Sequence, residues 1–180
     1  MAPAPRRRIT DGERGLLRSV FEETLPYGSL ELTTNVGNIG GETNSITPGG
    51  IPMFATGIWC ADFNAPGADK STFIHEFMHV WQYYHGITKL SAIWLVVRHL
   101  GDYERAYPYD LSDSDDITDF NIEQQAAIIE DFWRLGSSMS PLNNVGSNKN
   151  PASYNRYADQ VRSAGPPHTP AIPPIPRHWR

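Results

Sequence analysis

The sequence is poor in cysteine, in long apolar runs and in clustered positive charge. Cys60 is the single cysteine of the 180 residues, which excludes an intramolecular disulfide and a zinc site built from several cysteines. The most apolar window, SAIWLVVRHL, is interrupted by Arg98 and His99 after seven residues, far short of a membrane span. We therefore expect neither a disulfide framework nor a membrane-spanning segment.

Charge and N-terminal composition restrict the partners and the compartment. The formal net charge is −5, and the one dense basic cluster, Arg6 to Arg8, lies in a proline-containing arm. Nucleic acid and anionic membranes are therefore not favoured as partners. No apolar segment of the signal-peptide type follows these charges, so we expect synthesis in the cytoplasm. If the protein leaves the cell, we expect machinery other than a cleaved signal to carry it.

Length and composition predict one folded domain between two irregular ends. A chain of 180 residues with 39% apolar content can bury a core of its own. Residues 1–9 are expected to form a flexible basic arm and residues 10–164 the domain. Residues 165–180 form a proline-rich tail, which lacks too many backbone donors to pack as helix or sheet.

Turn residues and apolar spacing predict an α+β fold. Short β-prone pieces cut by glycines lie between residues 30 and 64 and indicate a small sheet. Asp69 or Ser71 is a candidate cap for the next helix, which Gly86 ends. The predicted helices cover about residues 10–25, 71–85, 89–100, 121–135 and 151–164, and residues 102–120 are expected to form a long surface loop.

The segment STFIHEFMHVWQYYHG, residues 71–86, contains an H-E-x-x-H motif at His75, Glu76 and His79. Four residues advance a helix by about 400°, so the two histidines project from nearly one face and can share a cation. Glu76 lies beside that cation, where a carboxylate can take a proton from an activated water and pass it to a leaving amine. Imidazole ligands with an open position suit zinc, and we expect one zinc ion per chain.

A catalytic zinc needs a third protein ligand, and the sequence offers two candidates. His85 completes the register of the metzincin pattern, but Gln82 replaces the glycine that breaks the helix in that pattern. In an unbroken helix, His85 lies about 15 Å beyond the first histidine along the axis. Glu123, in a second helix, would complete a gluzincin arrangement, and Glu130 on nearly the same face could orient a ligand. Position alone leaves Glu123 equally compatible with a solvated first-turn glutamate.

Other residues are candidates for contact with a substrate. Tyr107, Tyr109 and His85 carry groups that could stabilise a developing oxyanion. Metallopeptidases commonly bind substrate along an edge strand beside the active-site helix, and MFATGIWCADF, residues 53–63, is placed for that role. An ordinary core strand explains the same segment equally well.

The blocks HEFMHVWQYYHG and DFNIEQQAAIIEDFW resemble the zinc metallopeptidase domain found at the C-termini of some type VI secretion spike proteins of the VgrG type, and in related Rhs/Vgr-associated sequences. The resemblance covers roughly residues 15–135. It implies a zincin-like, gluzincin-type α+β fold, with His75, His79 and Glu123 as zinc ligands and Glu76 as general base and acid.

The resemblance also implies a biological role. The family suggests an antibacterial effector that hydrolyses peptide bonds of a protein in the periplasm of a competing cell, with a cognate immunity protein in the producer. We expect no attached spike domain, and therefore expect a secretion spike or another partner to deliver the protein. The alternatives are a hydrolase of cell-wall peptide cross-links and a non-catalytic, zinc-stabilised binding or toxin module. Glu76 argues against a purely structural zinc, because that position contributes no ligand.

Overall fold

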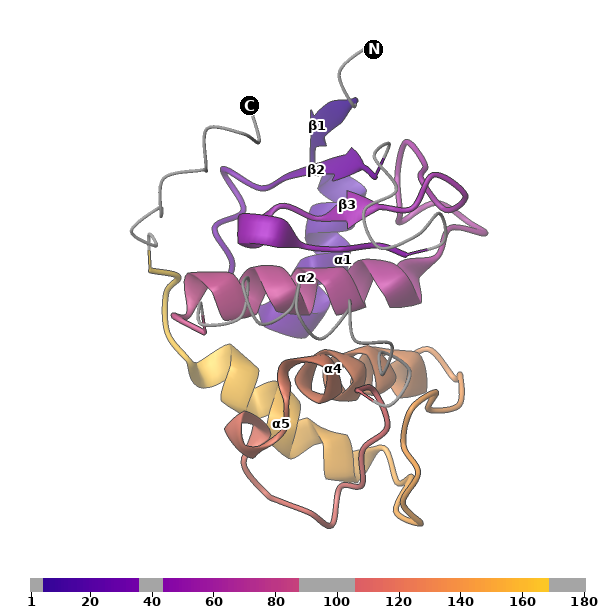
Figure 1. The fold of residues 1–180 in the computed structure, drawn as a ribbon, viewed down its shortest axis with the longest axis vertical. Helices are drawn as coiled ribbons and strands as arrows, with labels where there is room; N and C mark the ends of the chain where they lie inside the picture. Colours follow the sequence, from indigo (N-terminus) through magenta and orange to yellow (C-terminus); the bar gives the residue numbers. More distant parts are fainter. Residues whose placement is uncertain (1–4, 36–43, 88–105, 169–180) are drawn as a thin grey trace.

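The computed structural model describes residues 5–35, 44–87 and 106–168 (Figure 1). Within them the fold is α+β, as the sequence predicts. The α-helices are α1 (Asp11–Phe21), α2 (Lys70–Tyr84), α4 (Ile122–Gly136) and α5 (Ala152–Ser163), and the strands are β1 (Arg6–Arg8), β2 (Glu31–Thr34) and β3 (Met53–Phe54). Two short 3-10 helices, η1 (Pro48–Gly50) and η3 (Ile117–Asp119), complete the described elements. The helix predicted over residues 89–100 lies outside the described residues.

The sheet is small, as the sequence predicts. Its order is β1-β2-β3, with β1 antiparallel and β3 parallel to β2. Of the predicted strand over residues 53–63, Met53 and Phe54 alone are in the sheet. The chain then turns, because the Ala55 carbonyl accepts from the backbone N–H groups of Ile58 and Trp59, both at 3.1 Å.

The basic N-terminal segment is ordered over Arg6–Arg8, where the sequence predicts a flexible arm. The Arg7 guanidinium forms a bidentate pair with Glu13, at 2.8 and 2.6 Å, and the Glu13 carboxylate is fully buried. The same carboxylate accepts from the backbone N–H groups of Thr10 and Phe63, both at 2.8 Å. A buried carboxylate requires such partners, so Arg7 attaches β1 to α1, and the expectation of a free arm is wrong for these residues.

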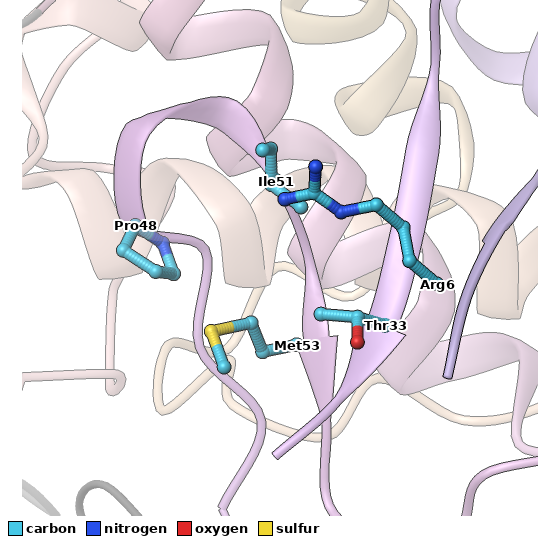
Figure 2. Close-up of a pocket in the computed structure, with 5 residues that line it drawn as sticks. All are labelled: Arg6, Thr33, Pro48, Ile51 and Met53. Atoms are coloured by element: carbon cyan, nitrogen blue, oxygen red, sulfur yellow. The ribbon is translucent and has the colours of Figure 1, made fainter. Parts of the chain in front are cut away.

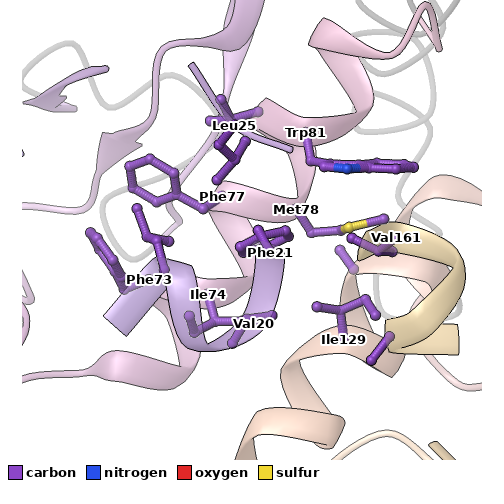
Figure 3. Packing of buried hydrophobic residues seen from close by; sticks show 14 of the residues in the cluster. Val20, Phe21, Leu25, Phe73, Ile74, Phe77, Met78, Trp81, Ile129 and Val161 are labelled. Carbon is purple, nitrogen blue, oxygen red and sulfur yellow. The ribbon is translucent and has the colours of Figure 1, made fainter. Parts of the chain in front are cut away.

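Helix α2 runs between the sheet and α4, and it supplies the centre of the core (Figure 1). Figure 3 shows its apolar side chains meeting those of α1, α4 and α5, where Met78 lies near Ile129 and Val161. On the sheet side, Phe73 stacks on Phe63 with ring centroids 5.0 Å apart. Because both flanks of α2 are covered, every residue from Phe73 to Gln82 is buried.

Local signals define the ends of α2. Its N-cap is Asp69, whose side chain accepts from the Thr72 N–H at 3.0 Å. The helix continues through Gln82 without a break and ends before Gly86, whose φ of 83° favours glycine. None of the helices in the described part of the chain is long and apolar enough to cross a membrane.

Candidate metal centre

Three side chains from two helices converge between α2 and α4. His75 and His79 come from α2 and Glu123 from α4, and one ligand atom from each lies within 4.8 Å of the others. Glu123 Oε2 is 3.3 Å from Nε2 of both histidines, and all three residues are buried. The i, i+4 spacing on α2 brings the two imidazoles together, with ring centroids 5.0 Å apart.

The first turn of α4 presents Glu123. Asn121 caps the helix, and its side chain accepts from the N–H groups of Glu123 and Gln124, at 2.9 and 3.0 Å. The Gln124 side chain accepts in turn from the Asn121 N–H, which completes a capping box. The cap fixes where the helix begins, and packing against α2 directs its first-turn carboxylate towards the histidines.

The cluster concentrates charge in a buried place. Burial alone would lower the pKa of His75, but hydrogen bonds to Glu123 and Glu130 raise it to about 10. Burial likewise favours neutral Glu123, yet the two histidines outweigh it and hold the pKa of that carboxyl well below its usual range. A carboxylate and two imidazoles form a donor set that a divalent metal stabilises, and two nitrogens with one oxygen suit zinc with an open position.

Each histidine has a partner on its other ring nitrogen. Nδ1 of His75 donates to Glu130 Oε2 at 3.1 Å, and Glu130 is the residue that the sequence analysis considers able to orient a ligand. Nδ1 of His79 donates to Gln82 Oε1 at 2.8 Å. Sequence reasoning treated Gln82 as the residue that leaves the helix unbroken and missed this contact, although a position three residues after a histidine lies on the same helical face.

Glu76 lies beside the three converging groups and has a partner of its own. It is 5% exposed, and its Oε2 accepts from the Thr47 hydroxyl at 2.6 Å. Burial raises the pKa of this carboxyl above its usual range, and the neighbouring histidines oppose that effect. Thr47 immediately precedes η1, 29 residues before Glu76, and no local sequence signal connects the two.

The structure separates the three candidates for oxyanion stabilisation. The centroid of the Tyr107 ring lies 5.5 Å from that of the His75 ring, so this tyrosine adjoins the candidate metal centre. His85 stacks on Trp81 at 4.3 Å, with Nδ1 2.8 Å from the Trp81 carbonyl and Nε2 3.3 Å from the Gly165 carbonyl. Both nitrogens of His85 face backbone oxygens, and the three converging ligand atoms do not include it.

Tyr109 belongs to a separate buried network. Its hydroxyl donates to Asp131 Oδ2 at 2.7 Å and lies 3.1 Å from the Tyr154 hydroxyl. Asp131 also accepts from the N–H groups of Leu142 and Asn143, at 2.6 and 3.1 Å. These contacts connect α4 to the following loop and to α5. The described part of the predicted surface loop, residues 106–120, is therefore partly core: its buried apolar side chains are Tyr109, Leu111, Ile117 and Phe120.

A cavity of about 310 Å³ opens on the sheet beside η1. It is lined by Arg6, Thr33, Pro48, Ile51 and Met53 (Figure 2). Pro48 directly follows Thr47, which contacts Glu76. The sequence suggests that residues 53–63 could bind substrate as an added strand. At Met53 the outer edge of β3 is already occupied, because Met53 exchanges two backbone hydrogen bonds with Ile46, at 3.0 and 2.7 Å.

Comparison with known proteins connects this geometry to one relative. No protein-family model matches the chain. The chain is 28% identical over 138 residues to the type VI secretion system spike protein VgrG2b of Pseudomonas aeruginosa, a match that covers 71% of the chain. It spans 13% of that relative's length. The chain resembles its effector part.

The structural comparison supports that statement. The solved effector domain of Pseudomonas aeruginosa VgrG2b superposes with a TM-score of 0.62 at 26% identity, over 73% of this chain and 75% of the effector domain. The similarity therefore extends over most of both folds. It supports the expected relation to a VgrG-associated effector domain.

Proposed function

We propose that this protein is a zinc-dependent peptidase of zincin-like fold that acts as a type VI secretion effector. The observation that carries the proposal is the joint placement of Glu76 with His75, His79 and Glu123. The last three converge through one ligand atom each. The Glu76 carboxylate is buried beside them and accepts a hydrogen bond from the Thr47 hydroxyl. A structural metal site would not need this additional, separately held carboxylate.

The residues divide the work of amide hydrolysis. Zinc, when bound by His75, His79 and Glu123, supplies Lewis acidity that polarises a substrate carbonyl and acidifies water. Glu76 takes the proton of the attacking water and delivers it to the leaving amine, a role favoured by burial, which raises the pKa of this carboxyl above its usual range. Tyr107 adjoins His75 and is our candidate for contact with the developing oxyanion.

The biological assignment rests on similarity to the VgrG2b effector domain. We propose delivery by a secretion spike into the periplasm of a target cell, cleavage of a protein there, and a cognate immunity protein in the producing cell. Production in the cytoplasm should then be tolerated, and the same chain with an added secretion signal should be toxic. Equal toxicity in both compartments would exclude the periplasmic assignment.

Glu76→Gln tests the enzymatic part. The amide keeps the shape of the side chain but cannot carry the proton, so fold and zinc content should persist while hydrolysis and toxicity disappear. Glu23→Gln is the matched control, because this glutamate is exposed. Among the described residues, its one ion-pair partner is Arg18. Proteomics of target cells exposed to both variants would identify the cleaved substrate. Unchanged toxicity of Glu76→Gln would place the protein among binding modules, and released cell-wall peptides would identify a cross-link hydrolase.

A further inference from the structure

We propose that Gln82 is a positioning residue of the metal centre: it holds His79 with the proton on Nδ1 and Nε2 directed towards zinc. The inference rests on the proposed function, because it assigns a role within that zinc site. Gln82 is 3% exposed and lies on α2, one turn after His79. Its Oε1 is 2.8 Å from Nδ1 of His79. The other ring nitrogen of His79, Nε2, is 3.3 Å from Glu123 Oε2.

The orientation of the Gln82 amide follows from its neighbours. Its Nε2 lies 3.0 Å from the Ile122 carbonyl oxygen and 3.0 Å from Gln125 Oε1. The Gln125 amide is oriented in the same way, because its own Nε2 donates to the Phe120 carbonyl at 2.8 Å. Backbone carbonyls only accept, so both amides must direct their NH2 groups towards the start of α4 and Gln82 must offer its oxygen to His79.

An oxygen at this position determines the tautomer of His79. A carboxamide oxygen accepts but cannot donate, so Nδ1 of His79 carries a proton, and in the neutral ring Nε2 is the nitrogen whose lone pair is available to the metal. On His75 the Glu130 carboxylate makes the corresponding contact with Nδ1. Partners of this kind orient metal-binding histidines and raise their affinity for the metal.

The chemistry also explains why the residue is an amide and not a carboxylate. Glutamate at position 82 could accept from His79, but it would have no hydrogen for the Ile122 carbonyl or for Gln125. A glutamine satisfies both sides of the contact. Since Ile122 precedes Glu123, the same side chain that orients His79 also joins α2 to the turn of α4 that presents the third ligand.

Zinc affinity of the full chain tests the assignment, measured by competition with a chromophoric chelator. Gln82→Leu removes the acceptor, and the dissociation constant should rise about 10- to 100-fold. Gln82→Glu restores an acceptor for His79 and should bind zinc as tightly as the unchanged chain or more tightly, with lower thermal stability. Gln160→Leu is the matched control. Gln160 also connects two elements, accepting from Ile117 N–H and donating to the Asp115 carbonyl, and it makes no contact with the centre.

A folded Gln82→Leu with unchanged zinc affinity would overturn the inference, as would loss of affinity in Gln82→Glu equal to that in Gln82→Leu. If Gln82→Leu does not fold, long-range proton–nitrogen NMR of the zinc-loaded, unchanged chain decides: zinc on His79 Nε2 with a protonated Nδ1 is expected, and zinc on Nδ1 refutes it. Failure of the unchanged chain to bind zinc would instead refute the proposed function.

Discussion

Substitution of Glu123 and of His85 distinguishes the two ways of completing the zinc site. Glu123→Ala removes the oxygen that lies 3.3 Å from Nε2 of both His75 and His79. Glu130 cannot replace it, because its carboxylate contacts the opposite nitrogen of His75. Loss of an orienting partner costs about 10- to 100-fold in metal affinity, so loss of a direct ligand should exceed 100-fold, roughly 2.7 kcal/mol or more.

His85→Ala should behave differently, because both of its ring nitrogens face the backbone carbonyls of Trp81 and Gly165. The substitution should cost about 1–2 kcal/mol of folding free energy through lost hydrogen bonds and leave zinc affinity unchanged. Elemental analysis should give close to one zinc per chain for the unchanged protein and for His85→Ala, and chelator competition gives the affinities. If His85→Ala empties the site and Glu123→Ala does not, the convergence of ligands seen between α2 and α4 is not the metal site.

Further outcomes are expected for zinc affinity, for stability and for catalysis. Zinc affinity should rise with pH across the neutral range, because zinc competes with the proton on His75, whose pKa is raised to about 10. By the same linkage, the zinc-free fold should lose stability as pH rises through that pKa, which thermal unfolding of chelated protein can follow. Tyr109→Phe should cost about 1–3 kcal/mol of stability with kcat retained, since its hydroxyl serves a buried carboxylate, whereas Tyr107→Phe should lower kcat with little change in unfolding. The reverse pattern in that pair would remove Tyr107 from the site. Arg7→Ala should lower the free energy of unfolding by about 3–5 kcal/mol, measured with denaturant, because it leaves Glu13 buried without its cation. A change near zero would support the expectation of a flexible arm.

The sequence alone determined those features that depend on neighbours along the chain. Asp69, one of the two caps that the sequence proposes for α2, lies where that helix begins, because capping needs hydrogen bonds over two or three residues. The spacing of His75 and His79 places both on one helical face for the same local reason. The α+β class and the unbroken course of α2 through Gln82 were predictable on these grounds.

Tertiary structure decided which distant groups meet, and no spacing rule encodes that. Whether Glu123 points to solvent or to the histidines depends on how α4 packs on α2. The contact of Thr47 with Glu76 depends equally on long-range packing. So does the placement of Tyr107 beside His75 and of Tyr109 on Asp131. Burying a polar group without a hydrogen-bond partner costs free energy, so each of these groups has a partner in the fold. Which residue is that partner depends on the three-dimensional surroundings and not on the local sequence.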